Sequence, residues 1–474
     1  MRIDEHPILS FPEPENISFT YQEREITAQK GETIAAALHN QGITELSRSG
    51  DRKRSRGLFC AIGKCSSCLM KVDGVPNVRT CITMAREGME VEKQKGFPDI
   101  PSETSRLTTE TIFEKNTDVL VIGGGPAGLK ASLTAASAGA KVIIVDENPL
   151  LGGQMIKQTH KFFGSINQDA GERGKDIGEK LAAKVKDHPN IEVMTSTSAV
   201  GIFDAKIGIY KNREKFLKVN TKKTIVATGA TEDMIKFSNN DLPGVYGAGG
   251  IQTLMNVYGV KPGDRVLMVG AGNVGLIVAY QLLQADVEVE AIVEIAARIG
   301  GYFVHAAKVR RHGVPILTNH RVLRVDGESH VNKAVIAEVD EFGEVIRGSE
   351  QNLAVDVVAL AAGLSPSYKL LHHGGCELTF QPKLGGHVPL RDKRMKTTRD
   401  DIYVAGDVSG IEEATSAMLE GAIAGADAVL KLGEGGASEE KIIKESRKKL
   451  DELRAGPHYD DLRTGLREVV SEKD

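Results

Sequence analysis

The chain has 474 residues, of which 41% are hydrophobic and 26% are charged, and its formal net charge is −4 at pH 7. This composition predicts a globular protein of about three domains, and the negative balance argues against nucleic-acid binding. No apolar run approaches the ~18 residues of a membrane helix, and the acidic N-terminus lacks the apolar region of a signal peptide. We therefore expect a cytoplasmic protein that would reach a membrane only through partners.

The first 96 residues are expected to form a small domain. Two runs rich in β-formers, residues 17–21 and 25–28, precede an alanine-rich helical stretch at 34–40. Four of the five cysteines then follow within a short span, at Cys60, Cys65, Cys68 and Cys81. The spacing Cys-x4-Cys-x2-Cys with a later fourth cysteine is that of plant-type [2Fe-2S] proteins. Three thiolates on one tight loop can wrap the cluster, and the fourth, from a neighbouring strand, closes it.

Other interpretations of these segments remain open at the level of sequence. The cysteines could form two disulfides or a zinc knuckle, but cysteines two apart pair poorly and zinc sites usually use two Cys-x2-Cys halves. A basic loop at residues 48–56 precedes the cysteines, with Arg48, Arg52, Lys53, Arg54 and Arg56. Without interleaved aromatic residues it does not indicate nucleic-acid binding. It is expected to be a solvated loop, or a surface that docks an acidic partner or an anionic cofactor.

The second part begins after a Pro/Ser/Thr-rich stretch at 97–115, which predicts an interdomain linker. A β-rich run at 119–122 leads into a Gly-x-Gly-x-x-Gly turn, a helix of small residues at 127–140 and a second strand at 142–145 that ends in an acid. This register predicts a dinucleotide site, with the pyrophosphate at the helix N-terminus and the carboxylate on the ribose. The residues expected to contact it are Gly123, Gly125, Pro126, Ala127, Gly128, Asp146, Glu147, Gly153 and Gln154.

A second, independent fingerprint follows. The strand at 224–227 runs into Thr228 and Gly229, which we also assign to the first cofactor site, and a turn at 241–245 leads to a helix. Residues 265–294 then repeat the pattern of strand, glycine turn, helix and strand ending in an acid. Its expected contacts are Gly270, Gly272, Asn273, Val274, Gly275 and Glu294. The acid favours NAD, because it would repel the 2′-phosphate of NADP, although Arg298 lies nearby.

After residue 363 the chain is expected to return to the first nucleotide domain. The strand at 401–405 ends in Gly406 and Asp407, and a helix follows. An acid in this position suits a ribityl hydroxyl of FAD, although a simple helix cap is the alternative. The segment 433–474 reads as a charged amphipathic helix, a Gly-Pro break and a second helix. We expect it to be a solvated arm or a subunit contact.

Two weaker candidate sites remain. His160 could lie over a flavin ring, but a lone loop histidine is more often structural. His372 and His373 with Cys376 resemble metal ligands, but adjacent histidines and one cysteine lack ligand geometry, so Cys376 is expected to be a buried thiol. No second cysteine lies near the flavin motifs, which leaves a disulfide-reductase mechanism without its dithiol.

The segment Arg54-x-Arg56-Gly-Leu-Phe-Cys60, with the other three cysteines, Asp73-Gly74 and the later Asp241-Leu-Pro-Gly-Val245, resembles a known family. It is similar to the α subunit of heteromeric sarcosine oxidase and its relatives, hydrogen cyanide synthase, opine oxidase and dye-linked proline dehydrogenase. The resemblance covers residues 15–430 and, weakly, 454–457. Sarcosine-oxidase α chains continue into a folate-linked part, and other relatives into a cysteine-rich domain, which these residues do not include.

The resemblance implies an α/β fold in which a β-grasp [2Fe-2S] domain precedes two nested Rossmann-like domains of the disulfide-reductase type. We expect a cluster domain at 1–96, a linker at 97–115, an FAD domain at 116–245 and 364–432, an inserted NAD domain at 246–363 and a charged tail at 433–474. It also implies a partner β subunit, itself an FAD-containing amine oxidase, that holds the substrate. In some relatives an FMN lies at the subunit interface, or ATP replaces NAD.

The sequence thus predicts an iron–sulfur flavoprotein, the electron-transferring subunit of an amine or imino-acid (sarcosine, proline, hydroxyproline or opine) dehydrogenase or oxidase. A flavin takes two electrons and can release them singly, which suits a one-electron cluster on the same chain. The alternatives are a self-contained NADH-dependent reductase of an external acceptor, and a nucleotide-binding scaffold without its own turnover. The sequence identifies no catalytic residue, substrate or electron acceptor.

Overall fold

The computed structural model describes residues 1–11, 15–94, 96, 113–164, 168–203, 206–211 and 215–471. The chain forms two compact units, each built from two separate segments. Unit 1 comprises Met1–Glu103 and Glu232–Gly363, and unit 2 comprises Thr104–Thr231 and Leu364–Asp474. The predicted fold class, a ferredoxin-like domain followed by nested Rossmann-type domains, is confirmed.

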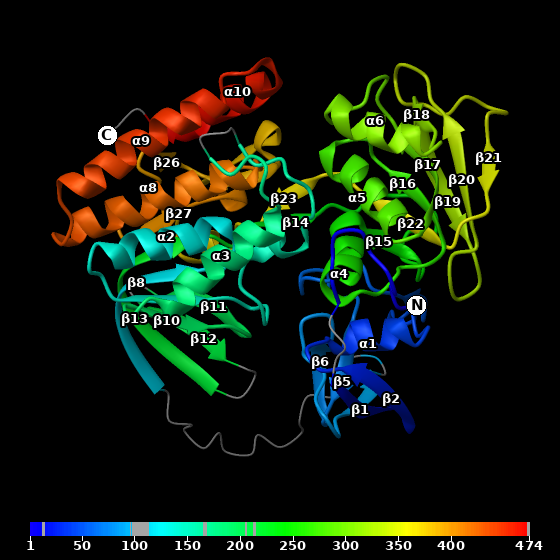
Figure 1. Ribbon diagram of the computed structural model, residues 1–474, viewed down its shortest axis with the longest axis horizontal. Coiled ribbons are helices and arrows are strands. Elements are labelled where there is room, and N and C mark those ends of the chain that lie inside the picture. The colour runs from blue at the N-terminus through cyan, green and yellow to red at the C-terminus, as the bar shows by residue number, and fades with distance from the viewer. Residues whose placement is uncertain are drawn as a thin grey trace. The chain divides into compact units, whose positions relative to one another are not determined.

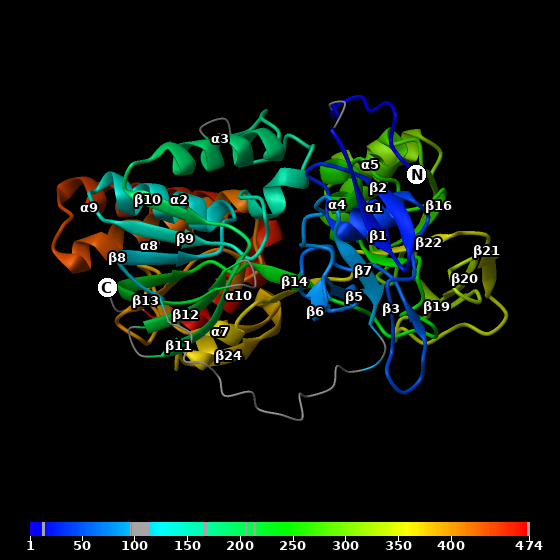
Figure 2. The ribbon, with the colours of Figure 1, turned by 90° about the horizontal axis from the view of Figure 1, so that it is seen from below.

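The N-terminal domain of unit 1 is a five-stranded sheet with one helix. The strand order is β2-β1-β7-β5-β6, and β1 and β7 are parallel. Its elements are β1 (Asn16–Tyr21), β2 (Arg24–Gln29), α1 (Ile34–Asn40), β5 (Leu69–Val72), β6 (Val75–Arg79) and β7 (Glu90–Lys93). Thr33 caps α1 by accepting the N–H of Ala36, and α1 packs beside β2 (Figure 2). A small hairpin, β3 (Ser47–Arg48) and β4 (Ser55–Arg56), carries the basic loop.

The inserted domain of unit 1 is built on a parallel sheet of order β15-β22-β16-β17-β18. Two of its inner strands, β22 and β16, consist almost entirely of buried apolar residues, as strands covered on both faces require. The elements are β15 (Val245–Gly247), α4 (Ala248–Tyr258), β16 (Arg265–Val269), α5 (Asn273–Gln284), β17 (Glu288–Glu294), α6 (Phe303–Arg311), β18 (Ile316–Thr318) and β22 (Val357–Leu360). A meander, β19 (His320–Asp326), β20 (Lys333–Glu338) and β21 (Gln351–Leu353), adjoins it.

The cluster domain packs directly on the inserted domain, so that unit 1 has a shared core. The first residues of the chain pair with the end of α4, where Ile3 donates its N–H to the Gly259 carbonyl at 2.8 Å. Phe59, next to the first cluster cysteine, accepts the N–H of Gly247 at 3.1 Å. A Cβ at Gly250 would overlap the Phe59 carbonyl oxygen, so α4 approaches the cysteine loop as closely as backbone allows.

Unit 2 is organised around a seven-stranded sheet. Its parallel part has the order β10-β9-β8-β13, with β27 on the other side of β13, and an antiparallel meander, β11-β12-β13, extends it. The strands are β8 (Phe113–Ile122), β9 (Val142–Val145), β10 (Ile191–Met194), β11 (Thr197–Phe203), β12 (Lys206–Lys211), β13 (Lys215–Val226) and β27 (Ile402–Val404). Of the expected linker at 97–115, residues 97–112 lie outside the described residues, whereas 113–115 belong to β8 and are not linker.

Two small-residue helices lie side by side in unit 2 (Figure 1). They are α2 (Pro126–Ser137) and α8 (Ala414–Leu432), and α3 (Gly174–Asp187) lies beside α2. A Cβ at Gly421 would overlap the Ala127 carbonyl oxygen, which shows how closely the two helices approach. This contact holds the helix that follows the first glycine turn against the helix that follows Gly406-Asp407.

The remaining elements of unit 2 are short. They are η1 (Gly153–Lys157), α7 (Lys369–His373), β24 (Leu378–Gln381), η2 (Pro382–Leu384), β25 (Gly386–Pro389), β26 (Arg391–Asp392), η3 (Asp407–Ser409), η4 (Pro457–Tyr459) and β28 (Val470–Ser471). The chain crosses from unit 2 to unit 1 within β14 (Ala230–Glu232) and returns at β23 (Leu364–Pro366), which pairs with it. The first crossing was expected at 245, but residues 232–245 lie with unit 1.

The C-terminal tail is not the solvated arm that the sequence predicts. Helix α9 (Ala437–Leu453) packs along α8, and its Ile443 and Leu450 are 2% and 4% exposed in the core of unit 2. Helix α10 (Asp460–Val469) covers Leu384 with Leu462 and Val469. The charged residues occupy the outer faces of an amphipathic pair, so the tail completes this unit. Within the described residues, no helix is long and apolar enough to cross a membrane.

Candidate functional site

The four cluster cysteines converge in unit 1. Cys60, Cys68 and Cys81 are buried, and Cys65 is partly exposed. The sulfur of Cys60 contacts that of Cys65, the sulfur of Cys68 contacts that of Cys81, and Cys60 also contacts Cys81. The thiols thus form two pairs that adjoin each other, which is the arrangement two irons with two thiolates each require. Among the described residues, no group of three His, Cys, Asp or Glu side chains is arranged to hold a single metal ion.

The backbone of the cysteine loop is shaped for this role. Gly63 has a φ of 77°, and a Cβ there would lie 2.7 Å from Ile82 Cδ1, so only glycine fits this curl. The N–H groups of Lys64 and Cys65 point at the sulfur of Cys60, at 3.3 and 3.4 Å. Contacts with the Cys65 and Cys81 thiols and with backbone N–H groups lower the pKa of Cys60, and the contacts with Cys60 raise the pKa of Cys65 and of Cys81. The residues present therefore fit a [2Fe-2S] cluster, held by Cys60, Cys65, Cys68 and Cys81.

The first glycine turn in unit 2 forms the expected strand–turn–helix. Gly125 is the N-cap of α2, Pro126 opens the helix, and no side chain caps its free N–H groups. A Cβ at Gly128 would overlap the Gly123 carbonyl oxygen, so the helix starts directly against the turn. An uncapped helix N-terminus with this close approach fits a pyrophosphate.

Asp146 lies at the end of β9 and turns back onto the glycine turn. Its Oδ2 accepts the N–H of Gly124 at 2.6 Å, and its Oδ1 accepts the N–H of Asn148 at 2.7 Å. Burial raises its pKa. Oδ1 also accepts from the Asn148 side-chain amide at 3.1 Å. A carboxylate has about four acceptor positions, so Asp146 keeps one for a ribose hydroxyl while its orientation is fixed. Gly153 closes the site from the other side, because a Cβ there would lie 2.6 Å from the Gly125 Cα; Glu147 is half-buried and Gln154 is exposed beside it.

Thr228 and Gly229 follow β13, which ends at Val226, in the same unit. The hydroxyl of Thr228 donates to the Ser367 carbonyl at 3.0 Å, and the Ser367 N–H donates to the Gly229 carbonyl at 2.9 Å. These bonds join the strand that leaves the first nucleotide fold to the segment that returns to it. Thr228 and Gly229 thus hold the crossing together, whatever contact they make with a cofactor.

The loop after β27 carries Gly406 and Asp407. Gly406 has a φ of 78°, which favours glycine, and it lies against Ala127 at the start of α2. Burial raises the pKa of Asp407 to about 7, and the nearby Glu412 and Glu420 carboxylates add to this effect, whereas the Glu412 N–H opposes it. Asp407 and the first glycine turn are therefore brought together, as an FAD site requires.

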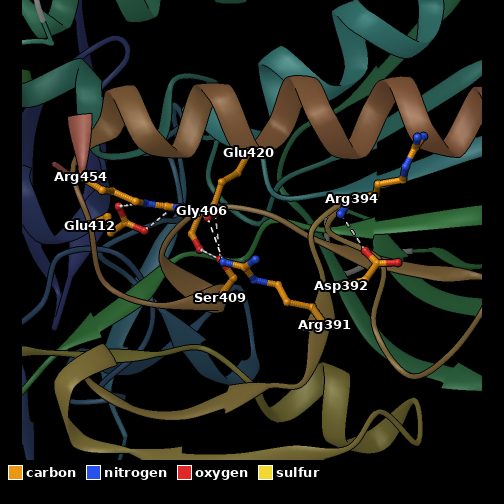
Figure 3. Close-up of polar contacts among 8 residues, drawn as sticks. All are labelled: Arg391, Asp392, Arg394, Gly406, Ser409, Glu412, Glu420 and Arg454. Carbon is orange, nitrogen blue, oxygen red and sulfur yellow. Dashed lines mark hydrogen bonds and ion pairs between the residues drawn. The ribbon is translucent and has the colours of Figure 1, made fainter. Parts of the chain in front are cut away.

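A buried ionic network, which the sequence analysis missed, holds this loop (Figure 3). Glu420 on α8 accepts the Gly406 N–H at 3.0 Å and the Ser409 hydroxyl at 2.8 Å through Oε2. Its Oε1 accepts from Arg391 at 3.1 Å and from Arg454 at 2.9 Å. Arg454, at the end of α9, also binds both oxygens of Glu412, at 2.6 and 2.9 Å. The C-terminal tail therefore positions the Gly406-Asp407 loop through two carboxylates.

The second glycine turn, in unit 1, repeats the geometry of the first. Gly272 is the N-cap of α5, without a side-chain cap, and a Cβ at Gly275 would overlap the Gly270 carbonyl oxygen. Glu294 ends β17, and its carboxylate accepts the N–H groups of Ala271 at 2.8 Å and Ala296 at 3.0 Å. It occupies the place of Asp146 in the first turn. The residues fit the adenosine and pyrophosphate of NAD.

The loop after Glu294 closes over this turn. Asn273, one of the predicted contacts, accepts the N–H of Tyr302 at 2.8 Å through its side-chain oxygen. A Cβ at Gly301 would lie 2.8 Å from the backbone carbonyl carbon of Gly272. Gly301 thus packs closely on the second glycine turn, as Gly153 packs on the first. Val274 is 42% exposed beside the helix start. Arg298 is also exposed, and no ion pair between it and Glu294 is formed in the described chain.

The basic hairpin lines a cavity of about 890 Å³ in unit 1. Three segments surround it: the hairpin with Arg52, Arg54 and Arg56, the cluster loop with Phe59 and Cys65, and the stretch that enters the inserted domain. Arg54 is anchored there by Asp241 at 2.5 Å. The sequence placed this basic loop near the cluster, and the structure brings it to the one cluster cysteine that is partly exposed.

The weaker candidates do not form a metal site in the described chain. The His160 ring stacks on Phe163 at 4.9 Å, which is a packing role. His373 accepts the Ile202 N–H at 3.2 Å through Nδ1 and packs against Phe203. Cys376 is 5% exposed and lies 3.5 Å from the Thr397 hydroxyl, and burial raises its pKa. It is the buried thiol that the sequence predicts.

Comparison with known families covers most of the chain. Residues 117–421 match the family described as pyridine nucleotide-disulphide oxidoreductase. Residues 14–96 match the description "2Fe-2S iron-sulfur cluster binding domain". Both matches confirm the prediction of a cluster domain ahead of nucleotide-binding domains.

Several named proteins are similar over a large part of this chain. The chain is 27% identical to the alpha subunit of sarcosine oxidase from Rhizobium meliloti, across 90% of this chain but 46% of that protein. It is 29% identical to an opine oxidase subunit from Rhizobium meliloti, across 69% of this chain and 65% of that protein. The chain thus spans about half the length of the sarcosine oxidase chains it matches.

Solved structures agree in fold. The structure of L-proline dehydrogenase from P. horikoshii superposes with a TM-score of 0.71 at 25% identity, covering 94% of this chain and 79% of that one. Thioredoxin reductase from T. acidophilum superposes with a TM-score of 0.55 at 20% identity, covering 67% of this chain and 99% of that one. The second likeness shows the nucleotide-binding fold alone.

Proposed function

Because the chain belongs to the pyridine nucleotide-disulphide oxidoreductase family, as an FAD-dependent oxidoreductase with a [2Fe-2S] domain, we propose that it is the electron-transferring subunit of a heteromeric amine or imino-acid dehydrogenase or oxidase. The observation that carries the proposal is the thiol loop of two adjoining sulfur pairs on the same chain as two complete glycine-turn sites. A chain with one cluster site and two nucleotide sites can transfer electrons both singly and in pairs.

We expect residues of this chain to hold and orient three cofactors: FAD, NAD and the [2Fe-2S] cluster. Asp146 accepts an N–H of the first glycine turn, and Gly406, next to Asp407, lies against Ala127 at the start of α2, where FAD would bind with its pyrophosphate at the helix N-terminus. A bound flavin takes up two electrons as a hydride and releases them singly. Glu294 holds the second turn for NAD. Cys60, Cys65, Cys68 and Cys81 would hold the cluster, and Lys64 and Cys65 donate N–H groups to the sulfur of Cys60.

The disulfide-reductase chemistry of this family is not what we propose here. That chemistry uses a redox-active pair of cysteines beside the flavin. Four of the five cysteines belong to the proposed cluster site, and Cys376, in unit 2, is buried against Thr397. No cysteine pair is therefore left to exchange electrons with a disulfide.

The substrate is assigned to a partner. The similar proteins are named as subunits of sarcosine oxidase, opine oxidase and hydrogen cyanide synthase, which supports a heteromer. We propose an FAD-containing, amine-oxidase-like β subunit that binds sarcosine, proline, hydroxyproline or an opine and passes electrons to this chain. The five free cysteines support a reducing, cytoplasmic location.

The experiment is steady-state dye reduction by the purified chain, with and without a co-expressed partner chain, on sarcosine, proline, hydroxyproline and opines. Turnover that requires the partner is the expected result. Robust turnover by the isolated chain would overturn the proposal of a heteromer.

A second candidate, an NADH-dependent reductase of an external acceptor, is favoured by the oriented Glu294 carboxylate at the second turn. The same assay with NADH as the only donor tests it. Partner-independent dye reduction by NADH would favour the reductase, and its absence would exclude it.

A further inference from the structure

The surface around the basic hairpin has a charge opposite to that of the whole chain. Residues 45–64 contain six Lys or Arg and two Asp or Glu, a net charge of +4, whereas the whole chain carries −4. The charge is concentrated in the segment that leads into the first cluster cysteine. A local field of this sign attracts anionic groups and steers their approach.

Part of this charge is not neutralised. Arg48 pairs with Glu45 at 2.9 Å, and Arg54 pairs with Asp241 at 2.5 Å. Arg52 is exposed and has no ionic partner in the described parts of the chain, and the buried Nε of Arg56 has no hydrogen-bond partner there either. Three carboxylates line the cavity: Asp51, Glu232 and Asp241, the partner of Arg54. Glu232 accepts the N–H of Gly249 at 2.6 Å.

Part of the cavity is lined by apolar side chains, and one of the cluster cysteines is among its lining residues. Phe59, Phe237 and Val245 line it, together with Met234, which is 43% exposed. Cys65 lies on its wall. A lining that combines a methionine and aromatic rings with arginines has the composition of a protein–protein contact surface. A site for a small anion would instead direct buried donors to one point, whereas Arg52 stands exposed on the hairpin.

We propose that the hairpin and cavity beside Cys65 form the docking surface for an acidic one-electron carrier protein, which exchanges electrons with the cluster through the Cys65 side. The proposal rests on the function proposed above, because it needs a cluster on these thiols. One electron leaves the reduced cluster, and the iron of a carrier such as a ferric cytochrome becomes ferrous. No bond is made or broken and no proton is moved.

The test uses an acidic b-type cytochrome as the probe and a basic c-type cytochrome as its counterpart. The affinity is measured by calorimetry with both proteins oxidised, and cluster reoxidation is followed by stopped flow. We expect the full chain to bind the acidic probe at 20 mM salt and to lose at least tenfold in affinity at 200 mM. The basic cytochrome should bind at least tenfold more weakly at 20 mM salt.

Two matched double variants separate docking from net charge. R52E/K53E reverses two charges on the hairpin, and R24E/R347E reverses two exposed charges of unit 1 outside the cavity lining. Both change the net charge by the same amount. R52E/K53E should weaken binding of the acidic probe and slow its reduction at least fivefold. R24E/R347E should change the affinity and the reduction rate by less than twofold. The EPR signal of the cluster should be unchanged in both.

The proposal fails if the acidic probe does not bind at low salt, or if the two double variants weaken it alike. A third arm adds inorganic phosphate at constant ionic strength. If millimolar phosphate displaces the probe from the wild type but has no such effect on R52E/K53E, the cavity is a small-anion site and the docking proposal is overturned. Absence of the EPR signal from the wild type would instead refute the proposed function.

Discussion

The buried ionic network makes a prediction about how the C-terminal tail supports the cofactor. Arg454 joins Glu412 and Glu420, and the three side chains are 13%, 6% and 2% exposed. With Arg391 the network has two positive and two negative charges. The substitution Arg454→Met keeps a similar length and apolar stem but leaves two buried carboxylates facing one arginine.

The expected magnitude follows from this burial. Removing one partner of a buried ion pair costs about 3–5 kcal/mol, whereas an exposed pair contributes ~0.2–1 kcal/mol. Glu420 also holds the Gly406 N–H and the Ser409 hydroxyl, so the loss falls on the loop that carries Asp407. Each ~1.4 kcal/mol transmitted to the cofactor complex weakens retention about tenfold. We therefore expect R454M to retain flavin at least tenfold more weakly.

The assay measures flavin and adenine nucleotide per chain by extraction, and the temperature at which flavin fluorescence is released on heating. The control is Lys448→Met on the same helix, because the Lys448–Glu452 pair is 3.9 Å long and mostly exposed; it should behave as the wild type. The double variant R454M/E412Q removes one negative charge along with the positive one and should lose less than the two single effects combined. Equal cofactor retention in R454M and K448M would refute this role of the tail.

The other sites give three further predictions. Cys65→Ser should abolish the [2Fe-2S] EPR signal and leave flavin content largely intact, since the cysteine loop and the first glycine turn lie in different units; a full rhombic signal would disprove the ligand assignment. Glu294→Ala should narrow a preference for NAD(H) over NADP(H), measured by fluorescence titration, because it removes the carboxylate that repels a 2′-phosphate; a wild-type preference for NADP(H) would contradict it. Burial raises the pKa of Asp407 to about 7 from 3.8, so the folded state holds a proton that the unfolded state releases, and the cofactor-free chain should lose stability as the pH rises from 4 to 7. Asp407→Asn should flatten this loss in thermal melts at pH 5 and pH 8, and an unchanged difference between the two pH values would contradict the assignment.

The parts of the fold that the sequence predicts well are those determined by residues close together along the chain. Each glycine turn lies within about thirty residues of its acid, so strand, turn, helix and carboxylate can be recognised together. The structure places Asp146 and Glu294 on equivalent N–H groups of the two turns. The cysteine spacing is equally local, because three ligands occupy one loop.

The burial of the C-terminal tail could not be predicted from its local sequence pattern. Its apolar positions, such as Ile443 and Leu450, are sparse among charges, and their burial depends on α8, which lies before them in the chain. In the sequence Arg454 resembles the surface charges of the tail, and only the structure shows that it pairs with Glu412 and Glu420. These contacts join residues more than thirty positions apart, so no periodicity within the tail encodes them.

The division of the chain was also hidden from sequence. Residues 232–245 have no strong period, and their place in unit 1 comes from pairings with distant residues, such as Ser238 with Arg324. The same packing brings Asp241 to Arg54, which the order of motifs along the chain does not indicate. The cavity beside Cys65 is a product of these long-range contacts.

The central claim, that one chain carries a one-electron cluster together with a flavin, is tested most directly by the absorption spectrum of the purified chain combined with cofactor extraction. The predicted result is a flavin band with iron–sulfur shoulders, extracted FAD, and iron and acid-labile sulfide in equal amounts. A spectrum without a flavin band, with only an adenine nucleotide in the extract or zinc in place of iron and sulfide, would contradict it.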